Sequence, residues 1–413
     1  MLKNLNWKKI LLLIGFICLI IIFTYGLYYF FFRQILPTSQ INKNISNANQ
    51  RLPTIGQGNL NIFLQNLNTG LPVLSNISPE KISKIARGDL TLTTKLDARE
   101  VLANSLLAKG NEIYYYDRLD GKFYRVTKDG QKQLLKDRAF YDVQKVNWSP
   151  KGDQAILEYP DGSNILYNFN TGQQTTLLKE LSDFAFDQGG NRISSELVTN
   201  NKDSNWLVTA NPDGSGMKYI EPLADKANDV QTAWSADNQI IAIYREGIDI
   251  GRQEIFPLGQ NNENFPSLVV EGRGFEGKWS PTDNTLIYSV YNQNSSYRPV
   301  LYVAKTGASG TSAVFNTGLS TWSNKCTFGS SKAYCGVPIN LPENSGLVPQ
   351  LAQASVYGFY EIDLNSGNSQ FIATPVGSNG TFYNVSNVTL SADGKYLYFT
   401  DYYSNELYSI QLQ

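Results

Sequence analysis

The chain has 413 residues, and its 35 Lys and Arg nearly balance its 36 Asp and Glu, giving a formal net charge of −1. It has no histidine, which excludes a Ser-His-Asp or Cys-His catalytic site within this chain and removes the commonest metal ligand. No cluster of Lys and Arg supports nucleic-acid binding.

Residues 10–32 carry no charge and are long enough to cross a bilayer as one helix. Lys3, Lys8 and Lys9 precede this run and only Arg33 follows closely, so the positive-inside rule puts residues 1–9 in the cytoplasm. A cleaved signal peptide is the alternative, but the run is longer than usual for one and no small-residue cleavage site follows. We predict an uncleaved signal anchor in the plasma membrane, with the rest of the chain on the outer side.

Residues 33–88 are the predicted linker. They are rich in Asn, Ser, Gln and Pro, and residues 33–53 have the composition of a flexible tether spanning on the order of 25 Å. Residues 59–74 include apolar side chains, so this part either packs on the following domain or contacts another chain.

From residue 89 onwards, a bulky residue, a polar turn and an apolar strand recur at roughly 40 to 60 residues. In Trp148-Ser-Pro-Lys-Gly, the Ser, Pro and Gly suit a type I turn. Four short strands per repeat make a propeller blade. The predicted fold is therefore all-β, a seven-bladed β-propeller of four-stranded blades over residues 89–413. Its seven anchor residues are Leu106, Trp148, Phe186, Trp234, Trp279, Phe328 and Leu390.

Three departures from the repeat carry information. The last repeat has three strands, so the strand pattern at Asp89–Leu96 is expected to supply its outer strand and close the ring. The widest spacing requires an insertion over Ile339–Val356, between the second and third strands of the sixth blade. Trp322-Ser323 repeats the motif, but no strand follows it at the required distance, so it marks no blade.

The Trp-Ser-Pro-x-Gly turn with its apolar strand, and Asn211-Pro-Asp-Gly-Ser-Gly at a hairpin, resemble the TolB-type, WD40-like propeller repeat. The resemblance covers about residues 89–413, and the whole layout is similar to membrane-anchored propeller proteins of unassigned function. It implies a fold rather than an activity, because such propellers serve many roles.

Cys326 and Cys335 flank a predicted two-residue hairpin loop, Ser330-Ser331. Counting outwards from the loop makes them a non-hydrogen-bonded pair, the arrangement in which side chains approach most closely. We expect a disulfide, which the predicted export to an oxidising space favours. Two reduced core thiols are the alternative, whereas a zinc site lacks further Cys or His ligands.

The sequence shows no catalytic, metal-binding or cofactor-binding motif. There is no Gly-x-Ser-x-Gly elbow, and the glycine-rich Glu271–Gly277 lacks the Lys-Ser/Thr of a phosphate loop and leads into a strand. A tight connection between blades is its simpler interpretation. Turns such as Asp393-Gly394 lack the spacing of calcium loops. We expect no enzymatic activity and no cofactor.

A partner surface is predicted at one mouth of the ring. The Glu271–Gly277 connection and the Ile339–Val356 insertion should lie on the same face, and extra loop length on a propeller is where binding concentrates. In the alternative interpretation, Arg273 merely pairs with a neighbouring carboxylate. The predicted surface residues are Glu271, Arg273, Phe275, Glu276, Glu343, Leu347 and Leu351.

These features favour a non-enzymatic platform that binds envelope proteins outside the plasma membrane. The alternative is a module that binds cell-wall glycan or an extracellular polymer through tyrosines such as Tyr114–Tyr116 and Tyr402-Tyr403. A hydrolase or lactonase sited in the channel is the third hypothesis.

Overall fold

The computed structural model describes residues 16, 18, 19, 23, 24 and 82–412. The predicted segment 1–9, most of the predicted span 10–32 and most of the linker 33–88 lie outside the described residues. Phe16, Cys18, Leu19, Phe23 and Thr24 are helical. Within the described part of the chain, no helix combines the length and apolarity needed to cross a membrane. The chain divides into two units, 1–57 and 58–413.

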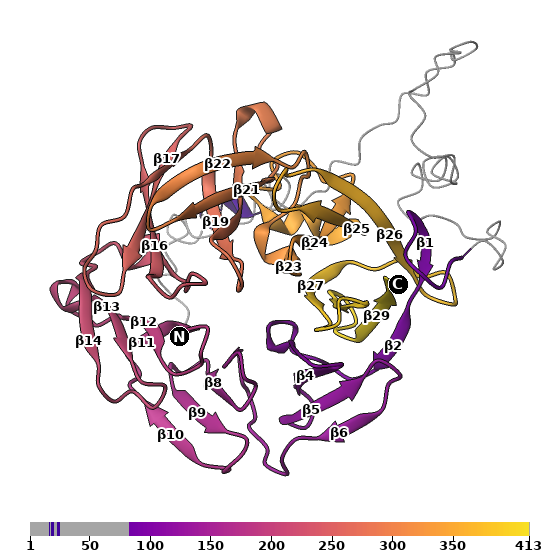
Figure 1. The fold of residues 1–413 in the computed structure, drawn as a ribbon, viewed down its shortest axis with the longest axis horizontal. Helices are drawn as coiled ribbons and strands as arrows, with labels where there is room; N and C mark the ends of the chain where they lie inside the picture. Colours follow the sequence, from indigo (N-terminus) through magenta and orange to yellow (C-terminus); the bar gives the residue numbers. More distant parts are fainter. Residues whose placement is uncertain (1–15, 17, 20–22, 25–81, 413) are drawn as a thin grey trace, which may run out of the picture. The chain divides into compact units, whose positions relative to one another are not determined.

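Residues 89–411 form seven sheets arranged in a ring, which confirms the predicted all-β, seven-bladed propeller (Figure 1). The first strand of each blade is innermost. Blade 1 comprises β3 (Leu107–Lys109), β4 (Glu112–Asp117), β5 (Lys122–Thr127) and β6 (Lys132–Leu134). Blade 2 comprises β7 (Lys145–Trp148), β8 (Gln154–Glu158), β9 (Asn164–Asn168) and β10 (Gln174–Leu177). Blade 3 comprises β11 (Leu181–Phe186), β12 (Ile193–Leu197), β13 (Trp206–Ala210) and β14 (Lys218–Pro222).

Blade 4 comprises β15 (Val230–Thr232), β16 (Ile240–Gly247), β17 (Gln253–Gly259) and β18 (Leu268–Val270). Blade 5 comprises β19 (Arg273–Trp279), β20 (Thr285–Tyr291), β21 (Val300–Gly307) and β22 (Gly310–Asn316). Blade 6 comprises β23 (Cys326–Phe328), β24 (Lys332–Ile339), β25 (Val356–Asp363) and β26 (Ser369–Val376). Blade 7 comprises β27 (Val385–Leu390), β28 (Tyr396–Asp401) and β29 (Leu407–Gln411). The 3-10 helices are η4 (Ala103–Ser105), η5 (Lys202–Ser204), η6 (Ala227–Asp229), η7 (Gln293–Ser295), η8 (Ser323–Lys325) and η9 (Pro349–Ala354).

Most predicted anchors end the first strand of a blade or, as Trp234 does, closely follow it. The prediction for Leu106 was wrong, because this residue precedes β3 instead of ending it. Lys109 pairs with Glu112 across a two-residue loop, so the first turn of blade 1 lies further along the chain than the Leu-Leu-Ala-Lys-Gly pattern indicated. Gly110 supplies the positive φ of 60° that this tight loop needs.

The predicted closing strand at 89–96 is in fact two strands that serve two blades. β1 (Asp89–Leu92) pairs parallel with β26 as a fifth strand of blade 6, and β2 (Thr94–Asp97) pairs antiparallel with β29 as the fourth strand of blade 7. The break falls at Thr93, whose backbone N–H still donates to the Val376 carbonyl of blade 6, 2.9 Å away. The chain therefore steps from one outer edge to the next at a single residue.

The apolar core of residues 82–412 is divided among the blade boundaries. Seven clusters of buried side chains each join residues of two neighbouring blades, such as Phe123 of blade 1 with Ala155 and Tyr167 of blade 2. Each sheet is therefore covered on both faces, which explains why the second strands are apolar without alternation.

Polar side chains on the inner part of the ring also join neighbouring blades. At six boundaries a side chain in or next to a first strand donates to a backbone carbonyl of the adjacent blade or of the segment leading into it. At the boundary of blades 2 and 3, Asn164 of β9 donates to the Leu181 carbonyl at 2.7 Å, and Lys145 lies 3.6 Å from Asp183. The six donors and acceptors are Trp148 to Ser105 (2.8 Å), Trp234 to Ala185 (3.1 Å), Gln231 to Gly277 (2.9 Å), Lys278 to Cys326 (2.7 Å), Lys325 to Val385 (2.9 Å) and Asn387 to Ala103 (2.5 Å).

The predicted disulfide between Cys326 and Cys335 is present, with the two Cα atoms 4.1 Å apart. The two residues face each other across β23 and β24, and the Gly329 N–H donates to the Lys332 carbonyl around the Ser330-Ser331 loop. The predicted hairpin register is therefore confirmed.

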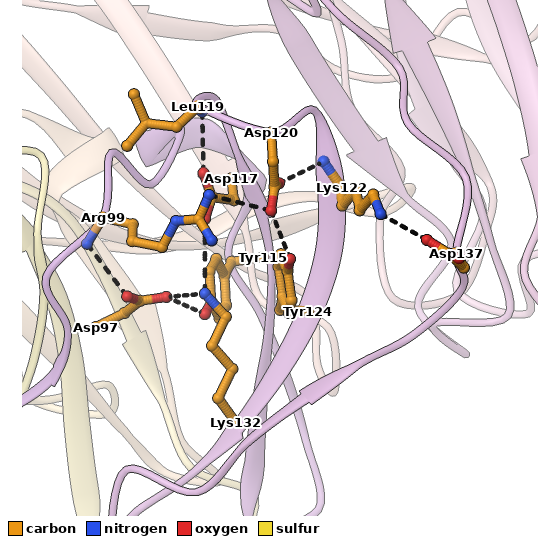
Figure 2. Close-up of polar contacts among 10 residues, drawn as sticks. All are labelled: Asp97, Arg99, Tyr115, Asp117, Leu119, Asp120, Lys122, Tyr124, Lys132 and Asp137. Atoms are coloured by element: carbon orange, nitrogen blue, oxygen red, sulfur yellow. Dashed lines mark hydrogen bonds and ion pairs between the residues drawn. The ribbon is translucent and has the colours of Figure 1, made fainter.

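A polar clasp joins the closing strand β2 to blade 1 (Figure 2). Lys132 of β6 lies 2.6 Å from Asp97 and 3.5 Å from the fully buried Asp117, and Tyr115 donates a hydrogen bond to Asp97. Arg99 lies 2.6 Å from Asp117. Burial would raise the pKa of Asp97, but the hydrogen bonds from Lys132 and Tyr115 outweigh it and hold that pKa below its usual value.

Candidate binding face and mouth pocket

The loops of the ring fall on two faces, because successive antiparallel strands run in opposite directions. One face carries the turns between first and second strands and between third and fourth strands; we call it the turn face. The other carries the loops between second and third strands and the connections between blades; we call it the insertion face, because it includes residues 340–355.

Exposed large apolar side chains are distributed very unevenly between these faces. Within residues 82–412, those that lie outside strands are all on the insertion face, and the turn face has none. The only others are Leu134, Tyr219, Val269 and Val314, each in an outermost strand. The insertion-face set is Leu119, Tyr141, Leu178, Val198, Ile248, Ile250, Tyr297, Leu347, Val348, Leu351, Tyr402 and Tyr403.

The insertion between β24 and β25 lies where the sequence predicted it and is fixed on both sides. Towards blade 5, the N–H of Gly346 donates to the Tyr297 carbonyl at 2.7 Å, and Arg298 donates to the Leu341 carbonyl at 2.7 Å. Towards blade 7, Gln353 donates to the Tyr402 hydroxyl at 2.6 Å. The insertion is therefore an ordered part of the face.

A cavity of about 560 Å³, the mouth pocket, opens where blades 4 to 7 meet the insertion. The inner strand β19 contributes Phe275 and Glu276, and the segment around η8 contributes Trp322 and Lys325. The insertion and neighbouring loops add glycine, proline, amide and tyrosine groups, among them Gly346, Pro299, Pro349, Gln350, Asn384, Tyr291, Tyr357 and Tyr402.

The structure brings part of the predicted surface together. Glu276 lines the pocket beside the insertion, whereas Leu347 and Leu351 are exposed on the insertion but are not among the lining residues. Phe275 borders the pocket, but its side chain is only 1% exposed and stacks on Tyr288 in the core, so it does not present the surface that was expected of it. Glu271 is exposed, and its carbonyl accepts a hydrogen bond from Asn292 at 2.7 Å. Glu343 lies 3.6 Å from Arg298.

The structure corrects both the extent of the Glu271–Gly277 connection and the alternative interpretation in which Arg273 pairs with a neighbouring carboxylate. The connection between blades is only Glu271 and Gly272, because β19 begins at Arg273. An innermost strand pairs on one side only, so Arg-Gly-Phe-Glu-Gly-Lys-Trp can alternate buried and partly exposed residues despite its charges. The ion pairs among residues 82–412 include none to Arg273, whose guanidinium instead occupies the place that a side chain at Gly247 would take.

The electrostatics of the pocket wall were not predicted. Glu276 of β19 interacts electrostatically with three cations, Arg245 of β16, Lys278 of β19 and Lys325 of η8. Burial lowers the pKa of Lys278 and of Lys325 to about 8, although Glu276 opposes the shift in both. Burial also raises the pKa of Glu276.

Sequence reasoning also missed Trp322 as a site residue. It precedes η8 and lines the pocket, while Ser323 donates to the Glu276 carbonyl at 2.8 Å. The signal was its failure to fit the repeat. The tyrosines divide as well: Tyr114–Tyr116 are buried in β4, whereas Tyr402 and Tyr403 are exposed on the insertion face.

No group of three or more Cys, Asp or Glu side chains within metal-binding reach occurs in the part of the chain that the structure describes. The carboxylates of the clasp are engaged by Lys132, Arg99 and tyrosine hydroxyls. The clasp is therefore a structural element of ring closure.

The fold and the site define a seven-bladed β-propeller with WD40-like structural neighbours. No protein-family model matches the chain, and no curated protein sequence matches it. The β-propeller domain of Cps50 (Swd1) from Myceliophteria thermophila is similar with a TM-score of 0.50 and 11% identity, covering 78% of this chain and 99% of that one. For Kuenenia stuttgartiensis hydrazine synthase the TM-score is 0.50 at 11% identity, over 75% and 95% of the two chains. For the WD40 repeats of RRP9 it is 0.48 at 11% identity, over 80% and 100%. At this identity, the likeness extends to the fold alone.

Proposed function

We propose that this protein is a non-enzymatic interaction platform whose insertion face binds a partner protein of the cell envelope. The observation that carries the proposal is the one-sided distribution of exposed large apolar side chains, since such groups in clusters mark contact surfaces. Tyr, Trp and Arg around the mouth pocket are the residue types that dominate protein interfaces.

In this proposal residues 10–32 are a membrane anchor and the propeller is held outside the plasma membrane. The apolar run with lysines before it supports the anchor, and the Cys326–Cys335 disulfide supports an oxidising compartment. The repeat supports assignment to TolB-type propellers.

The test is site-specific photo-crosslinking of the full chain in its native membranes. A photoreactive residue at Leu347 or Ile250 should give one shared crosslinked product. The same residue at Val314, which is also exposed but lies in an outermost strand, should not give it. Ile339 and Val356 already pair, so a two-residue Asn-Gly turn can replace residues 340–355 without disturbing the blade. This replacement should abolish the product from Ile250, because it removes the insertion from the proposed partner surface. Equal crosslinking from Val314 would contradict the proposal.

A second candidate, binding of cell-wall glycan, is favoured by the partly exposed indole of Trp322 beside Asn324 and Gln350. Aromatic faces flanked by side-chain amides suit sugar rings and their hydroxyls. Retention of the full chain on solubilised cell-wall glycan, lost in Trp322→Ala but kept in Trp206→Ala, would favour it over the first proposal.

A further inference from the structure

The wall of the mouth pocket has more positive than negative charge at close quarters. Arg245, Lys325 and one carboxylate, Glu276, line the pocket, whereas Lys278 interacts with Glu276 without lining it. Glu196 of β12 also interacts with Arg245, but burial raises the pKa of Glu196 to about 8. None of the ion pairs within residues 82–412 involves any of these side chains. Two lining cations and one lining carboxylate leave the wall short of negative charge.

Backbone carbonyls hold these cations in place. Arg245 donates to the carbonyls of Asn228 at 2.7 Å and of Asp229 and Phe275 at 3.2 Å each. Lys325 donates to the carbonyls of Val385 and Ser386, both at 2.9 Å. Carbonyl dipoles orient a cation without cancelling its net charge, so the positive charges of Arg245 and Lys325 stay at the pocket wall.

We infer that the mouth pocket binds a carboxylate side chain, Asp or Glu, of an extended segment of the partner protein. The inference rests on the proposed function. A guanidinium beside an ammonium suits a planar, two-oxygen anion. A cavity of about 560 Å³ holds one or two side chains and not a folded domain.

The walls indicate which neighbours the carboxylate should have. Trp322, Tyr357 and Pro349 present aromatic and apolar surface around the charges, and the exposed Leu347 and Leu351 continue that surface along the insertion. An acidic residue flanked by apolar or aromatic residues matches this arrangement. The two lysines have pKa values of about 8, which a bound carboxylate would raise again.

The test begins with a phage-displayed library of random short peptides, selected on the full chain in lipid nanodiscs. Selected peptides should be enriched in Asp and Glu next to aromatic residues. The best peptide should lose at least about tenfold in affinity, by fluorescence anisotropy, when its acidic residues are changed to Gln or Asn.

Three variants give results of different sign. Lys325→Gln should weaken binding about tenfold, Glu276→Gln should strengthen it by removing the competing carboxylate, and Lys305→Gln on the turn face should leave it unchanged. Since Lys325 also joins two blades, Lys325→Arg serves as the folded control that keeps the charge and the binding.

Peptides selected without acidic enrichment, or a Glu276→Gln variant that binds no better, would overturn the inference. If the crosslinks from Leu347 and Ile250 nevertheless persist in native membranes, the proposed function stands without it. A soluble polyuronate that outcompetes the acidic peptide would also overturn it, assigning the pocket to an acidic glycan.

Discussion

Lys132→Met should destabilise the ring at its closure. Lys132 bonds Asp97 of β2 at 2.6 Å and lies 3.5 Å from Asp117, whose side chain is fully buried (Figure 2). Removing one partner of a buried ion pair costs about 3–5 kcal/mol, because the remaining charge stays buried. The Lys132 side chain is 25% exposed, which reduces our expectation to about 2–3 kcal/mol.

The assay is urea and thermal unfolding followed by tryptophan fluorescence. Unfolding entropy of about 2 cal/mol/K per residue over roughly 330 residues converts this loss into a fall in Tm of about 3–4 °C. Lys128→Met on the preceding turn is the matched control. Its partner Asp129 is 65% exposed, so we expect a change of at most about 0.5 kcal/mol.

A double-mutant cycle tests the contact between Asp97 and Lys132 directly. Asp97→Asn combined with Lys132→Met should show a coupling of at least about 1 kcal/mol, since the two side chains are in direct contact. If Lys132→Met costs no more than Lys128→Met, the clasp does not hold β2 to blade 1 and the reasoning fails.

Three further predictions concern other parts of the ring. Replacing Cys326 and Cys335 by Ser should lower the free energy of unfolding by about 2–3 kcal/mol in urea titrations, and reductant should then have no further effect. Burial raises the pKa of Glu196 to about 8, so its contribution to stability is present at acid pH and lost as pH rises towards 8. The stability of Glu196→Gln relative to that of the wild type should therefore increase as the pH is raised from 5 to 8.5. A difference between their urea midpoints that is the same at both pH values would refute this prediction. Gly346→Ala would place a Cβ 2.5 Å from the Tyr291 ring, so a crystal structure of that variant should show the ring displaced and the pocket reshaped.

The architecture was predictable because the repeat records local physics. A bulky inner residue, a turn with fixed backbone geometry and a strand covered on both faces each leave a mark in a short stretch of sequence. The hairpin of Cys326 and Cys335 was predictable for the same reason, since its register follows from a two-residue loop.

The remaining features depend on contacts between distant residues. Nothing local in Asp89–Leu96 marks the step at Thr93, because it arises from the outer edges of blades 6 and 7. Similarly, the charges of β19 resembled a polar connection until its place at the inner edge of blade 5 was known. The pocket assembles Arg245, Glu276 and Lys325 from different blades, so no spacing in the sequence could have indicated it.

The two faces of the ring differ because the repeat motif fixes one of them. On the turn face, Ser235 donates to Asp237 at 2.5 Å and Ser391 donates to Asp393 at 2.6 Å, so these side chains hold the backbone of their own turns. Gly394 adopts a φ of 71° that few residues tolerate. Residues committed to turn geometry are not free to form a binding surface. The insertion face carries no such repeated requirement, and its loops vary from the two residues of Glu271-Gly272 to the insertion at 340–355. The motif that reveals the fold therefore carries little information about the ligand, whereas specificity must lie in the segments that depart from it.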